Sequence, residues 1–197
     1  MCQPGIVTDT TTATDRQARI DAICRAAIPV FARQGFRGTS MADLAAAAGM
    51  SRPALYQYFE NRADLFRVAF AALLERGTEA ALAALAEPAS TTDRLDGYLQ
   101  RLSGDGYEQL AATSHGDELM EAKHEFAADV AQQSYARAFA GLREFVDRTG
   151  ASAETSAAVV DLLTLSPLGL KSDRPAPDVY RGRLTSLARA AVALVEG

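Results

Sequence analysis

The stretch that decides the fold is residues 36–65, which read FRGTSMADLAAAAGMSRPALYQYFENRADL. Its pattern predicts two short helices, the first over residues 41–48 and the second beginning after Ser51. Gly49 lies between them and supplies the left-handed backbone conformation that a tight turn needs. Two short helices joined in this way cross at a steep angle. The second can then present its N-terminus to a major groove about 12 Å wide.

Geometry alone leaves two interpretations of this pair open, a helix-turn-helix and a plain helical hairpin in an all-α core. The polar residues favour the first, because only hydrogen-bond donors satisfy phosphate oxygens and helix N-termini add backbone N–H groups. Tyr56 and Tyr58 are two positions apart and thus about 200° apart around a helix, so at least one faces outward. The candidate donors are Ser40, Ser51, Arg52, Tyr56, Tyr58 and Arg62.

Longer helices are predicted on both sides of the pair. The first runs over residues 15–34 and ends at Gly35, and Pro29 inside it predicts a kink. Asn61 caps the helix that follows the pair, which continues until shortly before Pro88. The apolar stripe of the first helix, at spacings of three and four, comprises Ile20, Ile23, Ala27, Ile28 and Phe31.

The whole chain is predicted to be all-helical, because Ala, Leu, Arg and Glu dominate and strand-like alternation of β-branched residues is absent. Residues 1–14, which include a Thr-rich run, are expected to form a disordered arm. Residues 15–66 are expected to form an N-terminal three-helix domain, residues 67–197 a C-terminal helical domain, and the chain about nine helices in all. The C-terminal helices are placed at residues 91–103, 105–113, 116–149, 152–166 and 177–195.

Charge and composition narrow the class of protein. The net charge is −5, but residues 1–66 carry seven Arg and six acidic residues, and the rest carries thirteen basic and nineteen acidic residues. The first third is therefore the part whose charge does not repel phosphate. No apolar run approaches a membrane span, no signal-peptide pattern is present, and two cysteines form one bridge at most. We therefore expect a reduced, cytoplasmic protein.

The sequence offers no catalytic constellation. No nucleophile–base pair, Gly-rich phosphate loop or complete metal-ligand set occurs, so we expect neither an enzyme nor a cofactor. Glu121 and His124 have the Glu-x-x-His spacing of helical di-iron sites, but His115 is the only other histidine. A solvated, charged helix face is the favoured interpretation of this segment, and no metal is expected.

The opening stretch resembles the DNA-binding domain of TetR-family transcriptional regulators. The matching features are Phe-x-x-Thr-Ser at residues 36–40, Leu-Ala-x-x-Ala-Gly-Met-Ser at 44–51 and Leu-Tyr-x-x-Phe at 55–59, with a basic residue three positions later. With the preceding helix, the resemblance covers about residues 16–67 without a gap. Three residues depart from the family pattern: Pro29 inside the first helix, Arg62 in place of the more usual Lys, and Tyr58 in place of the frequent His.

The resemblance implies that residues 15–66 bind palindromic operator DNA and that residues 67–197 bind a ligand and dimerise. A single motif makes too few contacts for specific binding, and dimers that read two half-sites are the usual solution. Arg52 would contact a guanine, Pro53 or Ala54 a thymine methyl group, and the hydroxyl and basic groups the phosphates. The implied DNA-binding residues are Ser40, Ser51, Arg52, Pro53, Ala54, Tyr56, Gln57, Tyr58 and Arg62.

Two apolar sets are candidates for the other roles, although stripes of this kind usually seal a monomer's own core. The resemblance favours a two-fold four-helix interface formed by the last two helices. Its residues would be Val159, Leu163, Tyr180, Leu184, Leu187, Ala188 and Ala191. A ligand cavity among the middle helices would be lined by Tyr107, Leu110, Leu119, Met120, Phe126, Tyr135 and Phe139.

The sequence therefore predicts a homodimeric, ligand-responsive transcriptional regulator, usually a repressor in this family, which a small-molecule effector releases from double-stranded operator DNA. Release would be a population shift between two spacings of the recognition helices, limited by the differential affinity of the effector. Two alternatives stay open. One is a helical adaptor or binding protein that has lost DNA recognition, which the acidic net charge and the absence of Lys from residues 1–66 favour. The other is a metal-binding helical bundle.

Overall fold

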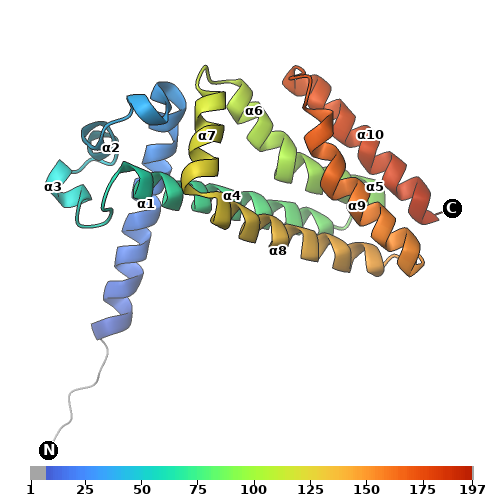
Figure 1. The fold of residues 1–197 in the computed structure, drawn as a ribbon. Helices are drawn as coiled ribbons and strands as arrows, with labels where there is room; N and C mark the ends of the chain where they lie inside the picture. The colour runs from blue at the N-terminus through green and yellow to red at the C-terminus, as the bar shows by residue number, and fades with distance from the viewer. Residues whose placement is uncertain (1–7, 197) are drawn as a thin grey trace, which may run out of the picture. The chain divides into compact units, whose positions relative to one another are not determined.

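The computed structural model describes residues 8–196, with side chains from residue 14 onward, and the described chain is helical throughout (Figure 1). Ten α-helices and one π-helical turn occur in this range, and no strand does. The helices form two compact units. The first comprises Met1–Ala72 and Asp117–Ala128, and the second comprises Leu73–Gly116 and Asp129–Gly197. The predicted all-α fold is confirmed.

The first unit is built around an aromatic core. The ring of Phe66 meets Phe31 at 5.2 Å and Phe36 at 5.3 Å between centroids, in both cases edge to face. Phe126, from much later in the chain, lies 4.9 Å from Phe36. The segment around Phe126 is therefore a core element of this unit. The unit contains α1 (Thr8–Gly38), α2 (Met41–Ala47), α3 (Arg52–Leu55), the first part of α4 (Arg62–Ala86) and α7 (Gly116–Phe126).

The second unit has a separate apolar core. Tyr98, Leu142, Leu163, Tyr180 and Leu184 are among its fully buried side chains. The Tyr98 hydroxyl finds no hydrogen-bond partner among the described residues, and burial raises the pKa of this phenol. The helices are the rest of α4, α5 (Thr91–Leu99), the π-helical turn η1 (Gln100–Gly104), α6 (Asp105–Ala111), α8 (Ala128–Asp147), α9 (Ala153–Leu170) and α10 (Pro177–Glu196). Of these, α9 and α10 pack side by side (Figure 1).

The start of the first helix differs from the prediction, and its predicted end at Gly35 is an interruption inside α1, which continues to Gly38. α1 begins at Thr8, because no Gly or Pro follows Gly5 to break a helix through the Thr run. The predicted disordered arm is therefore helical from Thr8, and residues 1–7 lie outside the described residues. Pro29 keeps helical dihedrals, and the interruption within α1 falls at Gly35, whose φ of 72° is left-handed as predicted.

Three helix limits in the second half of the chain correct the prediction. The expected helix 116–149 is divided at Ala127 into α7 and α8, because α7 packs in the first unit and α8 in the second. No Gly or Pro marks this break. α9 continues through Pro167 to Leu170, beyond the expected end at residue 166. The Pro167 ring is buried, and its carbonyl accepts a hydrogen bond from the Tyr180 hydroxyl at 3.1 Å.

The expected break near Gly104 is instead a continuous helical path. α5 passes through η1 directly into α6, with Gly104 as the last residue of the π-helical turn. A Cβ atom at Gly104 would lie 2.9 Å from the Gln100 side-chain oxygen and 3.1 Å from an Arg181 guanidinium nitrogen. A larger residue at position 104 would therefore displace these two side-chain ends, and Gly104 does not end a helix.

The two units also divide the chain differently from the predicted boundary at residue 66. α4 is one continuous helix across that position, and its residues belong to the first unit as far as Ala72. Residues 117–128, predicted to lie in the C-terminal domain, belong to the first unit. Within the described range, no helix combines the length and the hydropathy that a membrane crossing requires.

Candidate nucleic-acid interface

The start of α2 is a closed local hydrogen-bond network. Ser40 and Asp43 form a capping box: the Asp43 backbone N–H donates to Ser40 Oγ at 3.2 Å, and Ser40 N–H donates to Asp43 Oδ2 at 2.9 Å. Ser40 Oγ also donates to Asp43 Oδ2 at 2.6 Å. The side-chain bond from Ser40, followed by the backbone bond, lowers the pKa of Asp43. The single hydroxyl proton of Ser40 is therefore donated inside the motif, and its contact with a phosphate stays a prediction.

The turn between α2 and α3 has the predicted chemistry. Gly49 has a φ of 64°, the left-handed conformation that the turn needs. Ser51 caps α3 by accepting the Ala54 backbone N–H at 3.3 Å, which leaves the hydroxyl proton of Ser51 for another acceptor. Leu55 is 0% exposed and fixes the inner face of α3. The helix is thus attached to the core by one apolar residue.

The opposite face of α3 is open to solvent. Arg52, Pro53 and Gln57 are exposed and Ala54 is half-buried. Tyr56 is 43% exposed, and its hydroxyl accepts a hydrogen bond from the Arg52 guanidinium at 3.3 Å. The Arg52 guanidinium carbon also lies 5.6 Å from the centroid of the Tyr56 ring. These two side chains therefore orient each other on the exposed face.

Tyr58 follows on the other side of the same segment. Its side chain is half-buried, which distinguishes it from the exposed Tyr56. The guanidinium of Arg16, from α1, lies 5.6 Å from the centroid of the Tyr58 ring. Sequence reasoning missed Arg16. The stripe of α1 could have found it, because Arg16 is one helical turn before Ile20 on the same face.

Arg62, predicted to contact a phosphate, is engaged inside the unit. One of its guanidinium nitrogens donates to the backbone carbonyls of Thr39 at 2.7 Å and Arg37 at 3.0 Å. Its guanidinium carbon also lies 4.4 Å from the centroid of the Phe36 ring. Arg62 therefore attaches the start of α4 to the turn that leads into α2, and the structure gives it a local structural role.

α7 holds the same turn from another direction. The Arg37 backbone N–H donates to the Glu118 carboxylate, and the Arg37 guanidinium forms an ion pair with Glu121 at 3.0 Å. Glu121, considered above as a metal ligand, is thus paired with an arginine. No group of three or more potential metal-binding side chains occurs within the described residues. The turn at residues 35–39 is consequently held by α4 and by α7 together.

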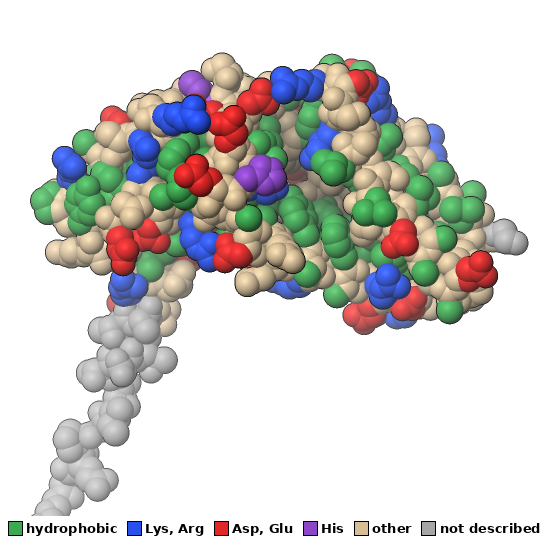
Figure 2. Space-filling model, viewed as in Figure 1, with side chains coloured by type: hydrophobic (Ala, Val, Ile, Leu, Met, Phe, Trp, Pro, Cys, Tyr) green, Lys and Arg blue, Asp and Glu red, His purple; other side chains and the backbone are tan. Residues whose placement is uncertain are grey.

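The predicted DNA-binding residues therefore fall into two groups. Ser51, Arg52, Pro53, Ala54, Tyr56, Gln57 and Tyr58 lie on or directly beside α3. Ser40 and Arg62 make the internal contacts described above. Figure 2 shows hydrophobic and basic side chains together at the end of the first unit that α3 occupies in Figure 1.

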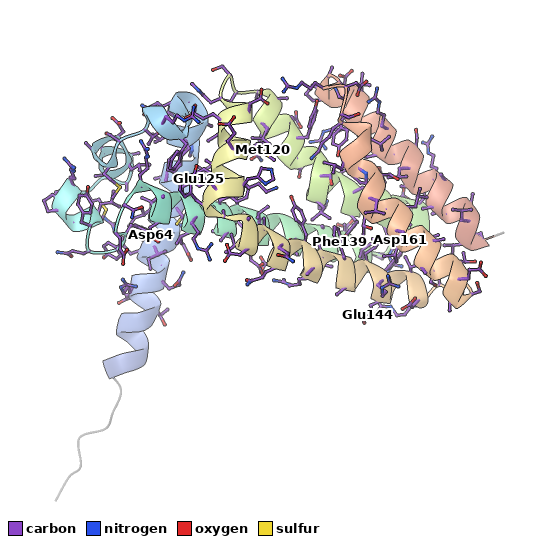
Figure 3. All side chains as sticks on the ribbon, viewed as in Figure 1. Asp64, Met120, Glu125, Phe139, Glu144 and Asp161 are labelled. Carbon is purple, nitrogen blue, oxygen red and sulfur yellow. The ribbon has the colours of Figure 1, made fainter. Side chains whose placement is uncertain are left out.

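The predicted ligand-cavity residues are divided between the two units. Leu119 and Phe126 of α7 pack against the core of the first unit, and Met120 also projects from α7 (Figure 3). Tyr107 and Phe139 pack against the core of the second unit. Tyr107 also donates a hydrogen bond to the Pro175 carbonyl at 2.6 Å, and Tyr135 lies 6.1 Å from Phe139 between ring centroids. Leu110 is half-buried on α6.

The predicted dimer residues are corrected by burial. Six of the seven are buried in the core of their own unit, and Leu187 packs partly buried against that core. A side chain with no exposed surface cannot contact a second copy. The stripe therefore seals the monomer, and other residues of α9 and α10 are exposed instead. The six buried residues are Val159, Leu163, Tyr180, Leu184, Ala188 and Ala191.

A capped α2, a left-handed glycine turn and a short α3 with an exposed polar face define a helix-turn-helix module in an all-helical protein. Residues 23–69 match the family model described as bacterial regulatory proteins, tetR family. Residues 23–69 are therefore similar to that family, and this match lies within the first unit.

The similarity extends to a curated relative and to solved structures. The chain is 31% identical over 115 residues to a probable HTH-type transcriptional regulator, ArpR, of Pseudomonas putida, and this match spans 56% of the chain and 52% of the relative. The chain thus covers about half the length of that relative.

Solved structures share the fold at low identity. A TetR-family regulator from Mesorhizobium loti superposes with a TM-score of 0.62 at 20% identity, over 94% of this chain and 98% of that chain. The TetR-family repressor AlkX from Dietzia sp. has a TM-score of 0.57 at 18% identity, over 91% and 98% of the two chains. These structures agree on the arrangement of helices.

Proposed function

We propose that the chain is a ligand-responsive transcriptional repressor that binds palindromic operator DNA as a homodimer, with α3 as the recognition helix. The exposed polar face of α3, opposite the fully buried Leu55, carries this proposal. Arg52 at the start of α3, and Tyr56 and Gln57 directly after it, present hydrogen-bonding groups to solvent beside one another. The likeness to regulators named as transcriptional supports the same function.

Each side chain on α3 is assigned by its chemistry. Arg52 contacts a guanine, because its planar guanidinium matches the two major-groove acceptors of that base. Pro53 and Ala54 meet thymine methyl groups, and Gln57 hydrogen-bonds a base edge. Tyr56 and Ser51 donate to phosphates. The Arg52–Tyr56 pair reduces the conformational freedom that Arg52 loses on binding.

The dimer forms through the exposed apolar residues of α9 and α10. Leu165 and Leu168 of α9 are each 71% exposed, although leucine side chains are costly to leave in water. Val179, Leu187 and Leu194 recur at spacings of eight and seven and so share one side of α10. A shallow groove along α10 and the end of α9 is lined by Leu170, Val179, Gly182, Arg183, Ser186 and Leu187.

The effector acts through α7. This helix belongs to the first unit, whereas the chain on both sides of it belongs to the second. Its carboxylates hold Arg37 in the turn that precedes α2. An effector that binds the second unit more tightly in one position of α7 therefore shifts the population of that turn, by no more than its differential affinity.

The proposal is tested by selecting duplexes from a random pool with the wild-type protein and measuring binding of the enriched duplex. We expect Arg52→Ala to relax the preference at one base pair and to cost about 1–3 kcal/mol. Arg148→Ala is the control, because Arg148 is an exposed arginine of the second unit that pairs with Glu144. If the wild-type protein enriches no sequence, a helical adaptor becomes the better interpretation.

The dimer is tested separately by sedimentation. Leu168→Glu places a charge on the proposed interface and should convert the dimer to monomers. Ala140→Glu places the same charge on an exposed position of α8 and should leave the dimer intact. A monomeric wild-type protein, or equal behaviour of both variants, contradicts the proposed interface.

A further inference from the structure

α1 extends beyond the core of the first unit. Residues 14–19 are all exposed, whereas Ile23 and Ala27, further along the helix, are buried. Arg16 precedes Ile23 by seven residues and Ala27 by eleven, so it lies on the face that faces the core. At Arg16 this face of α1 is no longer buried, because the core of the unit does not extend that far along the helix. The residue on it there is the basic Arg16.

The basic side chain meets the segment that follows the recognition helix. The Arg16 guanidinium carbon lies 5.6 Å from the centroid of the Tyr58 ring. The Arg52 guanidinium carbon lies at the same distance from the centroid of the Tyr56 ring. The segment thus carries two arginine–tyrosine pairs, one contributed entirely by residues 52–56 and the other completed by α1. A guanidinium over an aromatic face is attracted by the ring and keeps its edge N–H groups available as donors.

The charge of Arg16 is available for a partner. Among residues 14–196, no carboxylate forms an ion pair with Arg16. The nearby Asp15 and Asp21 lie on other sides of α1, at about 100° and 140° from Arg16 around the helix axis. Asp21 also accepts a hydrogen bond from Gln17 at 2.9 Å.

We propose that Arg16 is a DNA-contacting residue outside the helix-turn-helix, which binds a backbone phosphate next to the segment bound by α3. Tyr58 is a positioning residue that holds the Arg16 guanidinium. A duplex carries one negative charge per about 1.7 Å of its axis, so a guanidinium beside the recognition helix meets a phosphate without any requirement for sequence. The inference rests on the proposed function, because it needs α3 in the major groove.

The experiment compares Arg16→Ala with Arg25→Ala on the duplex enriched by the wild-type protein. Arg25 is exposed on the same helix and lies nine residues on, on the opposite side of α1. We expect Arg16→Ala to weaken binding to all duplexes alike and to reduce the slope of log K against log salt by about 0.9. Arg25→Ala should keep the wild-type slope, and both variants should keep the wild-type unfolding midpoint.

The role of Tyr58 is tested by two substitutions. Tyr58→Phe keeps the ring that holds Arg16 and should preserve the salt slope, whereas Tyr58→Ala should reduce it as Arg16→Ala does. In the double variant Arg16→Ala/Tyr58→Ala, the two effects should not add. A loss with Tyr58→Phe equal to that with Tyr58→Ala would assign the contact to the phenol hydroxyl and overturn the positioning role.

Failure of this inference is distinguishable from failure of the proposed function. If Arg16→Ala binds like Arg25→Ala while Arg52→Ala loses sequence preference, the recognition helix stands and the Arg16 contact is wrong. If the wild-type protein enriches no duplex, both proposals are wrong.

Discussion

The helix caps of the first unit and the polar contacts between helices of the second unit hold their side chains in different ways. In the first unit, the caps of α2, α3 and α4 are closed by residues three positions apart, as with Asn61, which accepts the Asp64 backbone N–H at 3.0 Å. In the second, Gln100 donates to the Arg181 carbonyl and Arg181 binds Glu108, across 81 and 73 residues. Local bonds follow from sequence spacing, whereas remote ones depend on the complete fold.

The apolar residues show the same contrast. On α3 the sequence separates Leu55 from its exposed neighbours, because the Ser51 cap and the Gly49 turn set where the helix begins. On α10 the stripe that contains Leu184 suits a monomer core and a dimer interface equally well. Because α10 packs against α5 and α9, Leu184 is buried in the core of its own unit.

The largest expected effect is in the core of the second unit. Leu184→Ala should cost about 2–5 kcal/mol of unfolding free energy, because Leu184 is fully buried and its removal leaves a cavity. Leu168→Ala lies on the exposed face of α9. It should change the part of the unfolding free energy that does not depend on protein concentration by less than about 0.5 kcal/mol. Urea unfolding at several protein concentrations separates the two. Equal losses would remove the distinction between buried and exposed faces.

The first unit also contains contacts between distant residues, and Arg62 tests one of them. Arg62→Ala should cost about 1–3 kcal/mol of unfolding free energy, because the carbonyls of Thr39 and Arg37 lose a charged donor. Arg62→Lys should recover part of this loss, since an ammonium lacks the planar shape that reaches both carbonyls and stacks on Phe36.

The control for Arg62 is Arg25→Ala, which removes an exposed arginine from the same unit. Thermal unfolding and DNA titration are measured on each variant. Unchanged stability together with a salt slope lower by about one unit would show that Arg62 contacts a phosphate after all.

Substitutions of Arg181 and Arg148 compare the stability that remote and local ion pairs contribute in the second unit. It binds Asp105 at 2.8 Å as well as Glu108 and Gln100, and its side chain is 33% exposed. Arg181→Ala should therefore cost about 1 kcal/mol after allowance for solvent screening. Arg148→Ala breaks an exposed pair four residues apart and should cost less than about 0.5 kcal/mol. Chemical unfolding that ranks the two variants in the reverse order would contradict this comparison.

The smallest effect concerns the pH dependence of the α2 cap. Hydrogen bonds from Ser40 lower the folded-state pKa of Asp43 from its ordinary value of 3.8. The stabilisation is therefore complete above that value and is lost as the pH falls through the lower folded-state pKa. Asp43→Asn should remove this acid-dependent part of the unfolding free energy. Asp64→Asn, in the first turn of α4, is the control and should leave the part that comes from Asp43 in place. An acid limb unchanged in Asp43→Asn would contradict the capping role.

Much of the first unit could be predicted because its determinants are close together in the chain. Gly35 and Gly49 have the left-handed backbone expected of them, and Ser51 and Asn61 cap the helices expected to follow them. The exposed face of α3 follows from the same short-range chemistry. The stripe of α1 gives the face on which Arg16 lies, but not its partner Tyr58, which is distant in sequence.

The sequence by itself determined an all-helical chain with a helix-turn-helix between residues 40 and 59, since caps, glycine turns and 3.6-residue periodicity act over a few residues. Tertiary structure alone decided that α7 joins the first unit, that Arg62 binds the turn before α2, and that Leu184 faces inward. The physical reason is that an amphipathic stripe or a charged side chain specifies the type of partner it needs. Which residue becomes that partner depends on how distant helices pack.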